Sequence, residues 1–583
     1  MPPFFASVIP LLRTPFGVDA FDYAIPEPLI VARGDLVHIP FRNQTLLGIV
    51  QETRETCAVK NPKNIIKQSG LHLPAPAIDL GAFIARRQCV SQATVWHAWL
   101  RRLPKQLPTY TKEPQPFPET SVGIFKKSWH MDPETALLDR AKNLLASSDA
   151  RRILLFTPWV CRARRWNESL NTSLVLHSEL ADGQAFRNWH AWLRGDVRCL
   201  VTTRLGAWLS PLADVVLIDE PEQDDYKQDE MSPRYDARTC FAWTSTHINT
   251  KVEAFGLTPP LADALDQDQP AVPQLTTNLI LSIRHPAGRS AIPLIQADTV
   301  NTLINHDGPR IILHPIRGLQ AKLTCRDCGW QARCASCGFS LSSEVKGTIC
   351  RHCGKHGEHI EQCNACGGTD LGKSWPGIEK LKLLWTKFHS NIEVGWRDLS
   401  MDALDAAFTE GSLVALTDGA LLGSWSEEVR RDELRILLFR RLAARVAQAH
   451  GTLLVQTGEA TAPTWERYAR PTSLQELWGE LLQQRRLFGY PPVKRLAKIL
   501  VTGSADEAQT LFTELQAACA HLKFMDWTCA GPFEVAFRRV SGSTRFAIHL
   551  QTPARTTDDE LLTVLTPFAK RCIIDLDSIN FFR

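Results

Sequence analysis

The chain is 583 residues long, which is too long for a single hydrophobic core and predicts about three to five domains. Its 44% hydrophobic and 22% charged residues are an ordinary globular composition, and its formal net charge of +4 permits a nucleic-acid partner without requiring one. No run approaches the roughly 18 apolar residues of a membrane span, and the proline-broken start lacks the basic residues of a signal peptide, so we expect no membrane partner and a cytoplasmic location.

Residues 1–103 predict a small β-rich domain. Short apolar runs separated by turn residues, as is typical of strands, lie at 6–12, 35–41 and 45–50. Apolar residues then recur with helical spacing over 80–103. The proline-rich stretch 104–121 follows and predicts a linker between domains.

The middle of the chain alternates buried-strand runs with helical patterns, which indicates α/β layers with parallel sheets. The clearest strands are expected at 151–158, 197–203 and 213–220. The tail begins near residue 474 with a charged amphipathic helix and then reads as strand, helix and strand, which predicts an α+β domain. The fold class expected for the whole chain is therefore multidomain α/β.

A cysteine-rich block at 324–367 predicts a metal centre. It holds four C-x-x-C pairs, which are Cys325/Cys328, Cys334/Cys337, Cys350/Cys353 and Cys363/Cys366. Each such turn places two thiolates on one side of a tetrahedral metal ion, so four pairs predict two zinc ions. All-cysteine sites leave no open position for a catalytic water, which indicates structural zinc. An iron–sulfur cluster is the competing hypothesis, although the spacing lacks the C-x2-C-x2-C run of ferredoxins.

Residues 366–375 match the phosphate-binding pattern G-x-x-x-x-G-K-[ST] through Gly367 and the triplet Gly372-Lys373-Ser374. We interpret this match as the end of the metal block and a surface turn. A phosphate loop needs a buried strand before it and should precede the acidic strand end at Asp219 and Glu220, and this stretch satisfies neither condition.

Several separate segments resemble the PriA family, the replication restart helicases of bacteria also known as primosomal protein N′. The similar segments are the eight-cysteine block, 21–50, 215–238, 485–503 and 573–582. The resemblance implies a 3′-end DNA-binding domain at 1–103, helicase lobes with parallel sheets at 122–308 and 309–470, and a C-terminal domain at 471–583. It also implies one zinc on Cys325, Cys328, Cys363 and Cys366, and a second zinc on Cys334, Cys337, Cys350 and Cys353.

The same resemblance implies a pocket for the 3′-terminal nucleotide of a nascent DNA strand. The matching positions are Phe21, Asp22, Gly34 and Lys63. A carboxylate can accept a hydrogen bond from a free 3′-hydroxyl, and a glycine lets the sugar approach the backbone closely. The alternative is that Phe21 belongs to the core and Asp22 caps a turn.

The helicase motifs are degenerate. At 121–138, where the family has its glycine loop, no glycine precedes a Lys-Ser/Thr pair, and Phe125 and Trp129 would block a phosphate. Residues 439–450 keep arginines but lose the glycines and spacing of the arginine-finger motif. Asp219 and Glu220 are then relics of the family's metal-binding strand end, and ATP and Mg²⁺ are not expected as cofactors.

The hypothesis that follows is a replication restart protein without its own helicase activity. It would bind stalled or branched forks, 3′ ends and single strands of DNA. By resemblance its protein partners would be primosome proteins, the loaders of the replicative helicase and single-strand-binding protein. Two alternatives remain open, which are an active ATP-dependent 3′–5′ DNA helicase and a zinc-ribbon scaffold that binds only proteins. We find no segment that matches the family's winged-helix domain.

Overall fold

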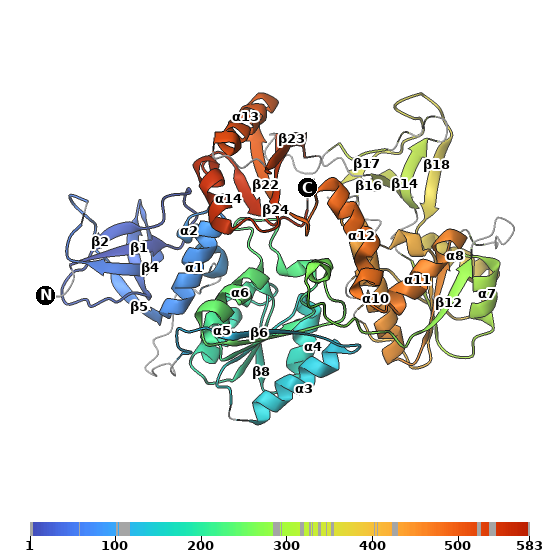
Figure 1. The fold of residues 1–583 in the computed structure, drawn as a ribbon, viewed down its shortest axis with the longest axis horizontal. Coiled ribbons are helices and arrows are strands. Elements are labelled where there is room, and N and C mark those ends of the chain that lie inside the picture. The colour runs from blue at the N-terminus through green and yellow to red at the C-terminus, as the bar shows by residue number, and fades with distance from the viewer. Residues whose placement is uncertain are drawn as a thin grey trace.

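The structure is a computed structural model of the chain, and it arranges the elements around three larger and several smaller sheets (Figure 1). It describes every residue except 1–3, 58, 101–102, 104–116, 148, 284–291, 293, 315–319, 326–327, 329, 331, 336–339, 345–346, 351–354, 401–402, 405, 423–428, 522–525, 536–543 and 581–583. Most of the expected linker, 104–116, lies outside the described residues. None of the described helices is long and apolar enough to cross a membrane.

The N-terminal domain is an antiparallel sheet with the strand order β2-β1-β4-β3-β5. Its elements are β1 (Phe5–Pro10), β2 (Phe21–Ala24), β3 (Asp35–Phe41), β4 (Gln44–Arg54), β5 (Lys67–His72), α1 (Ala75–Arg87) and α2 (Gln92–Leu100). The strands expected from the apolar runs are confirmed, and the helical stretch is two helices. Trp96 of α2 packs edge-to-face on Trp208, with ring centroids 6.1 Å apart, so this domain is docked on the next one through its core.

The first parallel domain is a six-stranded parallel sheet with the order β6-β11-β10-β7-β9-β8. Its strands are β6 (Ile124–Trp129), β7 (Ile153–Phe156), β8 (Ser173–Leu176), β9 (Cys199–Thr202), β10 (Val215–Asp219) and β11 (Lys251–Gly256). Its helices are α3 (Pro133–Ala146), α4 (Val160–Leu170), α5 (Asp182–Leu193) and α6 (Ala237–His247). β7, β9 and β10 are buried at every position, which confirms the three strands expected from continuous apolar runs.

The second parallel domain is a five-stranded parallel sheet with the order β12-β21-β20-β13-β19. Its strands are β12 (Asn278–Ile283), β13 (Arg310–Leu313), β19 (Gly395–Arg397), β20 (Leu413–Leu416) and β21 (Thr452–Thr457). Its helices are α7 (Ala297–Ile304), α8 (Ile378–Phe388), α10 (Arg431–Gln448), α11 (Ala462–Ala469) and α12 (Leu474–Phe488).

The cysteine-rich block leaves the second parallel domain as two small antiparallel sheets, one of two and one of three strands. They are built from β14 (Gln320–Cys325) with β18 (Leu371–Pro376), and from β15 (Leu341–Glu344), β16 (Gly347–Cys350) and β17 (His356–Gly357). The C-terminal domain is an antiparallel sheet, β23-β24-β22-β25, flanked by two helices. These elements are β22 (Lys494–Gly503), α13 (Ala505–His521), β23 (Thr528–Glu534), β24 (Thr544–Pro553), α14 (Asp558–Leu565) and β25 (Ile573–Leu576).

Two of the expected boundaries fall inside packed units. β12 hydrogen-bonds to β21 in the second sheet, although its residues precede the boundary expected at 308. α12 follows the boundary expected at 470, yet its Leu477 and Trp478 are buried in the same core as Phe439 of α10. A long-range pairing and a shared core decide these limits, and neither is visible in a local pattern.

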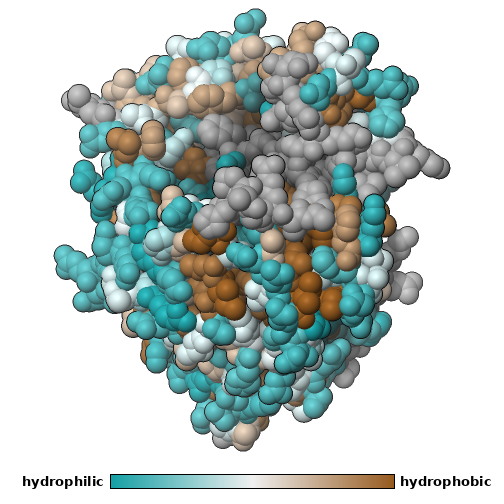
Figure 2. Space-filling view, turned by 90° about the vertical axis from the view of Figure 1, so that its right-hand side faces the viewer, coloured by the Kyte–Doolittle hydropathy of each residue, from teal (hydrophilic) through white to brown (hydrophobic). Residues whose placement is uncertain are grey.

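The surface is mostly polar but carries apolar patches on the side that holds the second parallel domain (Figure 2). Among the described residues of α8, Leu383 and Phe388 are 66% and 46% exposed. Scattered exposed apolar residues are normal for a globular protein.

Candidate functional site

The first metal centre is formed by Cys325, Cys328, Cys363 and Cys366. Their sulfur atoms all lie within 4.8 Å of one another, with Cys325 Sγ 3.6 Å from Cys366 Sγ and Cys328 Sγ 3.6 Å from Cys363 Sγ. Four convergent thiolates are the ligand set of a structural zinc, so the residues present fit the ion. The structure thus confirms a cysteine cluster able to hold one metal ion.

Backbone geometry explains why the second pair of this centre converges. The N–H of Gly367 donates to Cys363 O at 2.8 Å, and the N–H of Cys363 donates to Gly368 O at 2.8 Å. Gly367 has a φ of +73°, a left-handed conformation that favours glycine. The N–H of Ala365 also points to Cys363 Sγ at 3.4 Å, which suits a negatively charged sulfur.

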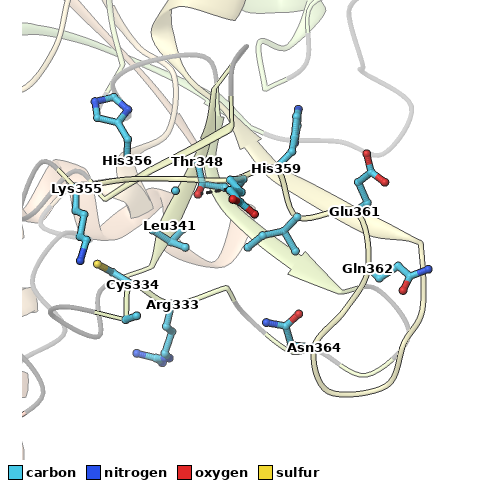
Figure 3. Close-up of a pocket in the computed structure, with 14 residues that line it drawn as sticks. Arg333, Cys334, Leu341, Thr348, Lys355, His356, His359, Glu361, Gln362 and Asn364 are labelled. Atoms are coloured by element: carbon cyan, nitrogen blue, oxygen red, sulfur yellow. Dashed lines mark hydrogen bonds between the residues drawn. The ribbon is translucent and has the colours of Figure 1, made fainter.

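The second cysteine set is only partly visible. Cys334 and Cys350 are buried beside Leu341, whereas Cys337 and Cys353 lie outside the described residues. Lys355, His356 and His359 line an open hollow of about 720 Å³ next to Cys334 (Figure 3). The second zinc therefore stays a prediction.

The phosphate-loop match at 366–375 is a strand after the metal turn, and the surface turn expected there is wrong. Gly372, Lys373 and Ser374 lie in β18, where they pair with Thr324, Leu323 and Lys322 of β14 in an antiparallel sheet. No helix starts at this point, so these residues do not form a phosphate-binding loop.

The N-terminal domain brings three of the four expected DNA-pocket residues to one edge of its sheet. Phe21 and Asp22 lie on the edge strand β2, and the N–H of Ala24, two residues further on, donates to Lys63 O at 2.9 Å. The Asp22 carboxylate is partly exposed, with Cys57 Sγ at 3.5 Å and Arg54 Nη1 at 3.7 Å. Neither contact caps a turn, and the carboxylate can accept a further hydrogen bond.

Gly34 is required by the fold, and its expected role beside the nucleotide stays a prediction. Its φ is +98°, and a Cβ there would lie 2.2 Å from Leu73 O, so this glycine serves close packing of two backbone segments. Sequence reasoning missed Arg42, which occupies the turn between β3 and β4 with a φ of +50°. Its guanidinium lies 5.9 Å from the Phe41 ring, and Phe41 in turn packs 5.2 Å from Phe21. The basic residue in the tight turn "FRNQ" is the signal that could have identified it.

The segment 121–138, where the sequence predicts a degenerate phosphate loop, forms strand β6, a short connection and helix α3. Trp129 fills the space beside Gly256, where an added Cβ would lie 2.2 Å from the indole. At the start of α3 the Asp132 carboxylate accepts the N–H of Thr135 at 3.1 Å, and Pro133 has no N–H to offer. The helix N-terminus is thus capped by the chain itself and is not free for a phosphate.

Asp219 and Glu220 lie at the end of β10, and protein groups surround both carboxylates. Asp219 Oδ2 accepts from Thr157 Oγ1 at 3.0 Å and from Trp166 Nε1 at 3.2 Å. Arg162 Nη1 lies 3.0 Å from Asp219 Oδ2 and 2.6 Å from Glu220 Oε1. Burial raises the pKa of Asp219 to about 6 despite the charge of Arg162. Burial acts the same way on Glu220, but Arg162 and Arg441 outweigh it and hold the pKa of Glu220 below its ordinary value.

Two arginines of α10 reach across from the second parallel domain to this cluster. Arg445 Nη1 and Nη2 lie 2.5 and 2.9 Å from the two carboxylate oxygens of Glu134, the second residue of α3. Arg441 Nη1 lies 3.3 Å from Glu220 Oε2, and its guanidinium covers the ring of Trp159 at 3.9 Å. Glu134 was not among the expected site residues, because its partners are distant in sequence.

The residues at this site do not fit a magnesium–nucleotide complex. The Asp219 and Glu220 oxygens that would bind the cation already accept from Arg162, and Glu134 adds negative charge at the helix start. A triphosphate needs free backbone N–H groups and an unpaired cation there. A magnesium–nucleotide complex bound in this cluster would therefore have to displace these ion pairs.

A pH-dependent contribution to stability is expected from Glu222, which is buried close to this strand end. Its Oε1 accepts the N–H groups of Leu257 and Thr258 at 3.1 and 3.3 Å, and burial raises its pKa from 4.5 to about 8. An acid with a raised native pKa stabilises the fold fully below pH 4.5, and that contribution is lost as the pH rises toward 8.

Because glutamine keeps the accepting oxygen, Glu222→Gln should remove this dependence. The free energy of unfolding of the variant should exceed that of the wild type by about 2 kcal/mol more at pH 7.5 than at pH 5.5, measured by urea denaturation. A constant difference between the two proteins across this range would contradict the assignment.

The fold defines a multidomain α/β protein in which two parallel-sheet domains carry an antiparallel N-terminal domain, a metal-binding insertion and a C-terminal α+β domain. Comparison with known families gives a match to "3'DNA-binding domain (3'BD)" of PriA over residues 11–101 and to "Primosomal protein N C-terminal domain" over residues 486–577. The chain therefore carries an N-terminal and a C-terminal domain that match domains of the PriA family.

Curated relatives bear the same name. The chain is 27% identical to "Replication restart protein PriA" of Haemophilus influenzae, over 66% of this chain and 58% of the relative. It is 22% identical to the protein of that name from Bacillus subtilis, over 68% of this chain and 55% of the relative. For Chlamydia muridarum the identity is 22%, over 70% of this chain and 61% of the relative. The chain thus matches between half and two thirds of the length of these relatives.

Proposed function

We propose that this chain is a replication restart protein that binds forked DNA and the 3′ end of a nascent strand without a helicase activity of its own. It recruits the proteins that load the replicative helicase, and its cysteine block carries two structural zinc ions. Phe21, Asp22 and Lys63, with Arg42 beside them, form the pocket for the terminal nucleotide.

One contrast supports the proposal most directly. The N-terminal domain matches a DNA-binding family, and its Asp22 carboxylate is partly exposed on the edge strand β2, next to the segment that contains Lys63. The strand end that a helicase would use for metal and nucleotide is, in this chain, closed by Arg162 and Glu134. Binding without turnover is the function that both observations favour.

Asp22→Asn tests the pocket with little change in shape. The wild type should bind a fork with a 3′-hydroxyl end better than the same fork with a 3′-dideoxy end, because the carboxylate accepts from the hydroxyl. The variant should lose about tenfold in affinity for the 3′-hydroxyl fork and should no longer distinguish the two ends. Fluorescence anisotropy at fixed salt measures both quantities, and the salt must be fixed because phosphate contacts release counterions.

Asp79→Asn is the matched control in the same domain. Asp79 lies on α1, is half-exposed and pairs with Arg33, away from β2, so this variant should keep the wild-type preference for a 3′-hydroxyl. Unchanged end discrimination in Asp22→Asn would refute the pocket. Binding of partner proteins with no DNA affinity would favour the scaffold alternative, and ATP hydrolysis stimulated by forked DNA would favour the active helicase.

A further inference from the structure

We propose that ion pairs made by the chain itself take the place of a nucleotide between the two parallel domains and hold these domains closed. The inter-sheet latch consists of four residues, Glu134 and Glu220 of the first parallel domain and Arg441 and Arg445 of the second. The inference goes beyond DNA binding, because it concerns how the two sheets are held in place.

The main contact of the latch is the bidentate pair between Arg445 and Glu134. Its two N–H···O distances of 2.5 and 2.9 Å join the fourth turn of α10 to the first turn of α3. The Arg445 side chain is 11% exposed and that of Glu134 is 19% exposed, so water screens the pair poorly. Bidentate arginine–carboxylate pairs also fix the relative orientation of the groups that they join.

The second contact connects α10 to the end of β10. Arg441 Nη1 lies 3.3 Å from Glu220 Oε2, and the guanidinium stacks 3.9 Å from the centre of the Trp159 ring. Glu220 has a φ of +46°, an unfavourable conformation for a residue with a side chain. The contacts of its carboxylate with Arg162 and Arg441 hold the residue in that conformation.

Both ends of the latch are anchored in their own domains. Phe439 and Leu442 of α10 are fully buried in the core of the second parallel domain. Leu137 and Ala141 of α3 are fully buried in the core of the first. Separation of the two domains would therefore pull the arginines away from the carboxylates.

Charge explains why the latch needs no ligand. The carboxylates of the cluster belong to Glu134, Asp219 and Glu220, and the guanidinium groups belong to Arg162, Arg165, Arg441 and Arg445. These charges nearly balance one another. A triphosphate would add several negative charges to a site that already has its own counterions, and it would have to displace Glu134.

Arg445→Gln and Glu134→Gln test the latch and keep Arg162 and Arg441, the two arginines that lie over the Trp159 ring. Trp159 is 8% exposed beneath Arg441, so opening of the domains should expose its indole. In hydroxyl-radical footprinting, each variant should oxidise Trp159 about tenfold faster than the wild type, because loss of the pair raises the open population. Trp192, which is fully buried inside the first parallel domain, should keep its wild-type rate and thereby shows that the domain stays folded.

Arg435→Gln is the matched control on the same helix. Arg435 pairs with Asp432 within α10, so its loss should leave the Trp159 rate unchanged. The addition of millimolar Mg·ATP should leave the wild-type footprint and melting temperature unchanged. A wild-type Trp159 rate in both latch variants would overturn the inference, and so would protection of the wild type by Mg·ATP. Neither result depends on whether the chain binds forked DNA.

Discussion

Arg162→Met is expected to destabilise the chain by about 3–5 kcal/mol, since it removes the cation that pairs with two buried carboxylates at once. The Arg162 side chain is fully buried, and its Nη1 contacts both Asp219 and Glu220. Methionine retains the apolar stem but leaves both carboxylates without this partner in a site shielded from water. Urea denaturation of the first parallel domain, followed by circular dichroism, measures the loss.

The destabilisation caused by Arg162→Met should increase with pH. Burial already raises the pKa of Asp219 to about 6, and without Arg162 the pKa will rise further. A protonated Asp219 no longer needs a cation, so the destabilisation should be smaller at pH 5.5 than at pH 8.

Arg164→Met is the control for this prediction. Arg164 lies on the same helix, but its pair with Glu179 is more than half exposed on both sides. Exposed pairs contribute about 0–1 kcal/mol, so this variant should be close to the wild type at both pH values. Equal losses for Arg162→Met and Arg164→Met would contradict the role that we assign to the buried cluster.

Features that depend on local sequence were predictable. The C-x-x-C pairs led directly to Cys325, Cys328, Cys363 and Cys366, because a tight turn with two thiols has few other uses. The continuous apolar runs led to β7, β9 and β10. A strand that is buried on both faces is apolar at every position, so it can be recognised directly in the sequence.

Features that depend on distant partners were not predictable. β6 was expected to be part of a loop because 121–138 matches the position of the family's glycine loop, yet it is an exposed edge strand paired with β11. Gly372 and Lys373 were taken for a turn because their partner strand β14 lies about fifty residues earlier. The contact of Glu134 with Arg445 spans 311 positions, so nothing near Glu134 in the sequence indicates its role.

Some residues of the expected 3′ pocket could be selected from the sequence, and the surroundings of others could not. Phe21 and Asp22 are neighbours in sequence, and a resemblance over a few residues was enough to select them. Lys63 was selected from its own short segment, and the bridge between Ala24 and Asn64 brings that segment to β2. Gly34 illustrates the limit, since the contact that requires a glycine at this position, with Leu73 O, comes from a distant segment of the chain.

Cys363→Ser should remove one zinc ion and so lower the zinc content of the chain from the two ions that we propose to one. A serine oxygen cannot replace a thiolate on zinc, and Cys363 is the ligand whose backbone N–H and carbonyl both hold the metal turn. Structural zinc contributes about 10–16 kcal/mol in zinc-finger peptides, so β14 and β18 should lose protection from hydrogen exchange once the ion is gone.

The same variant tests how the eight cysteines are divided between the two ions, because one remaining ion requires an independent set built on Cys334 and Cys350. Elemental analysis gives the ion count, and Cys529→Ser, a change in β23 of the C-terminal domain, should keep both ions. Zinc content equal to the wild type in Cys363→Ser would refute the first metal centre, and complete loss would show that the eight cysteines act as one unit rather than as two nested sites.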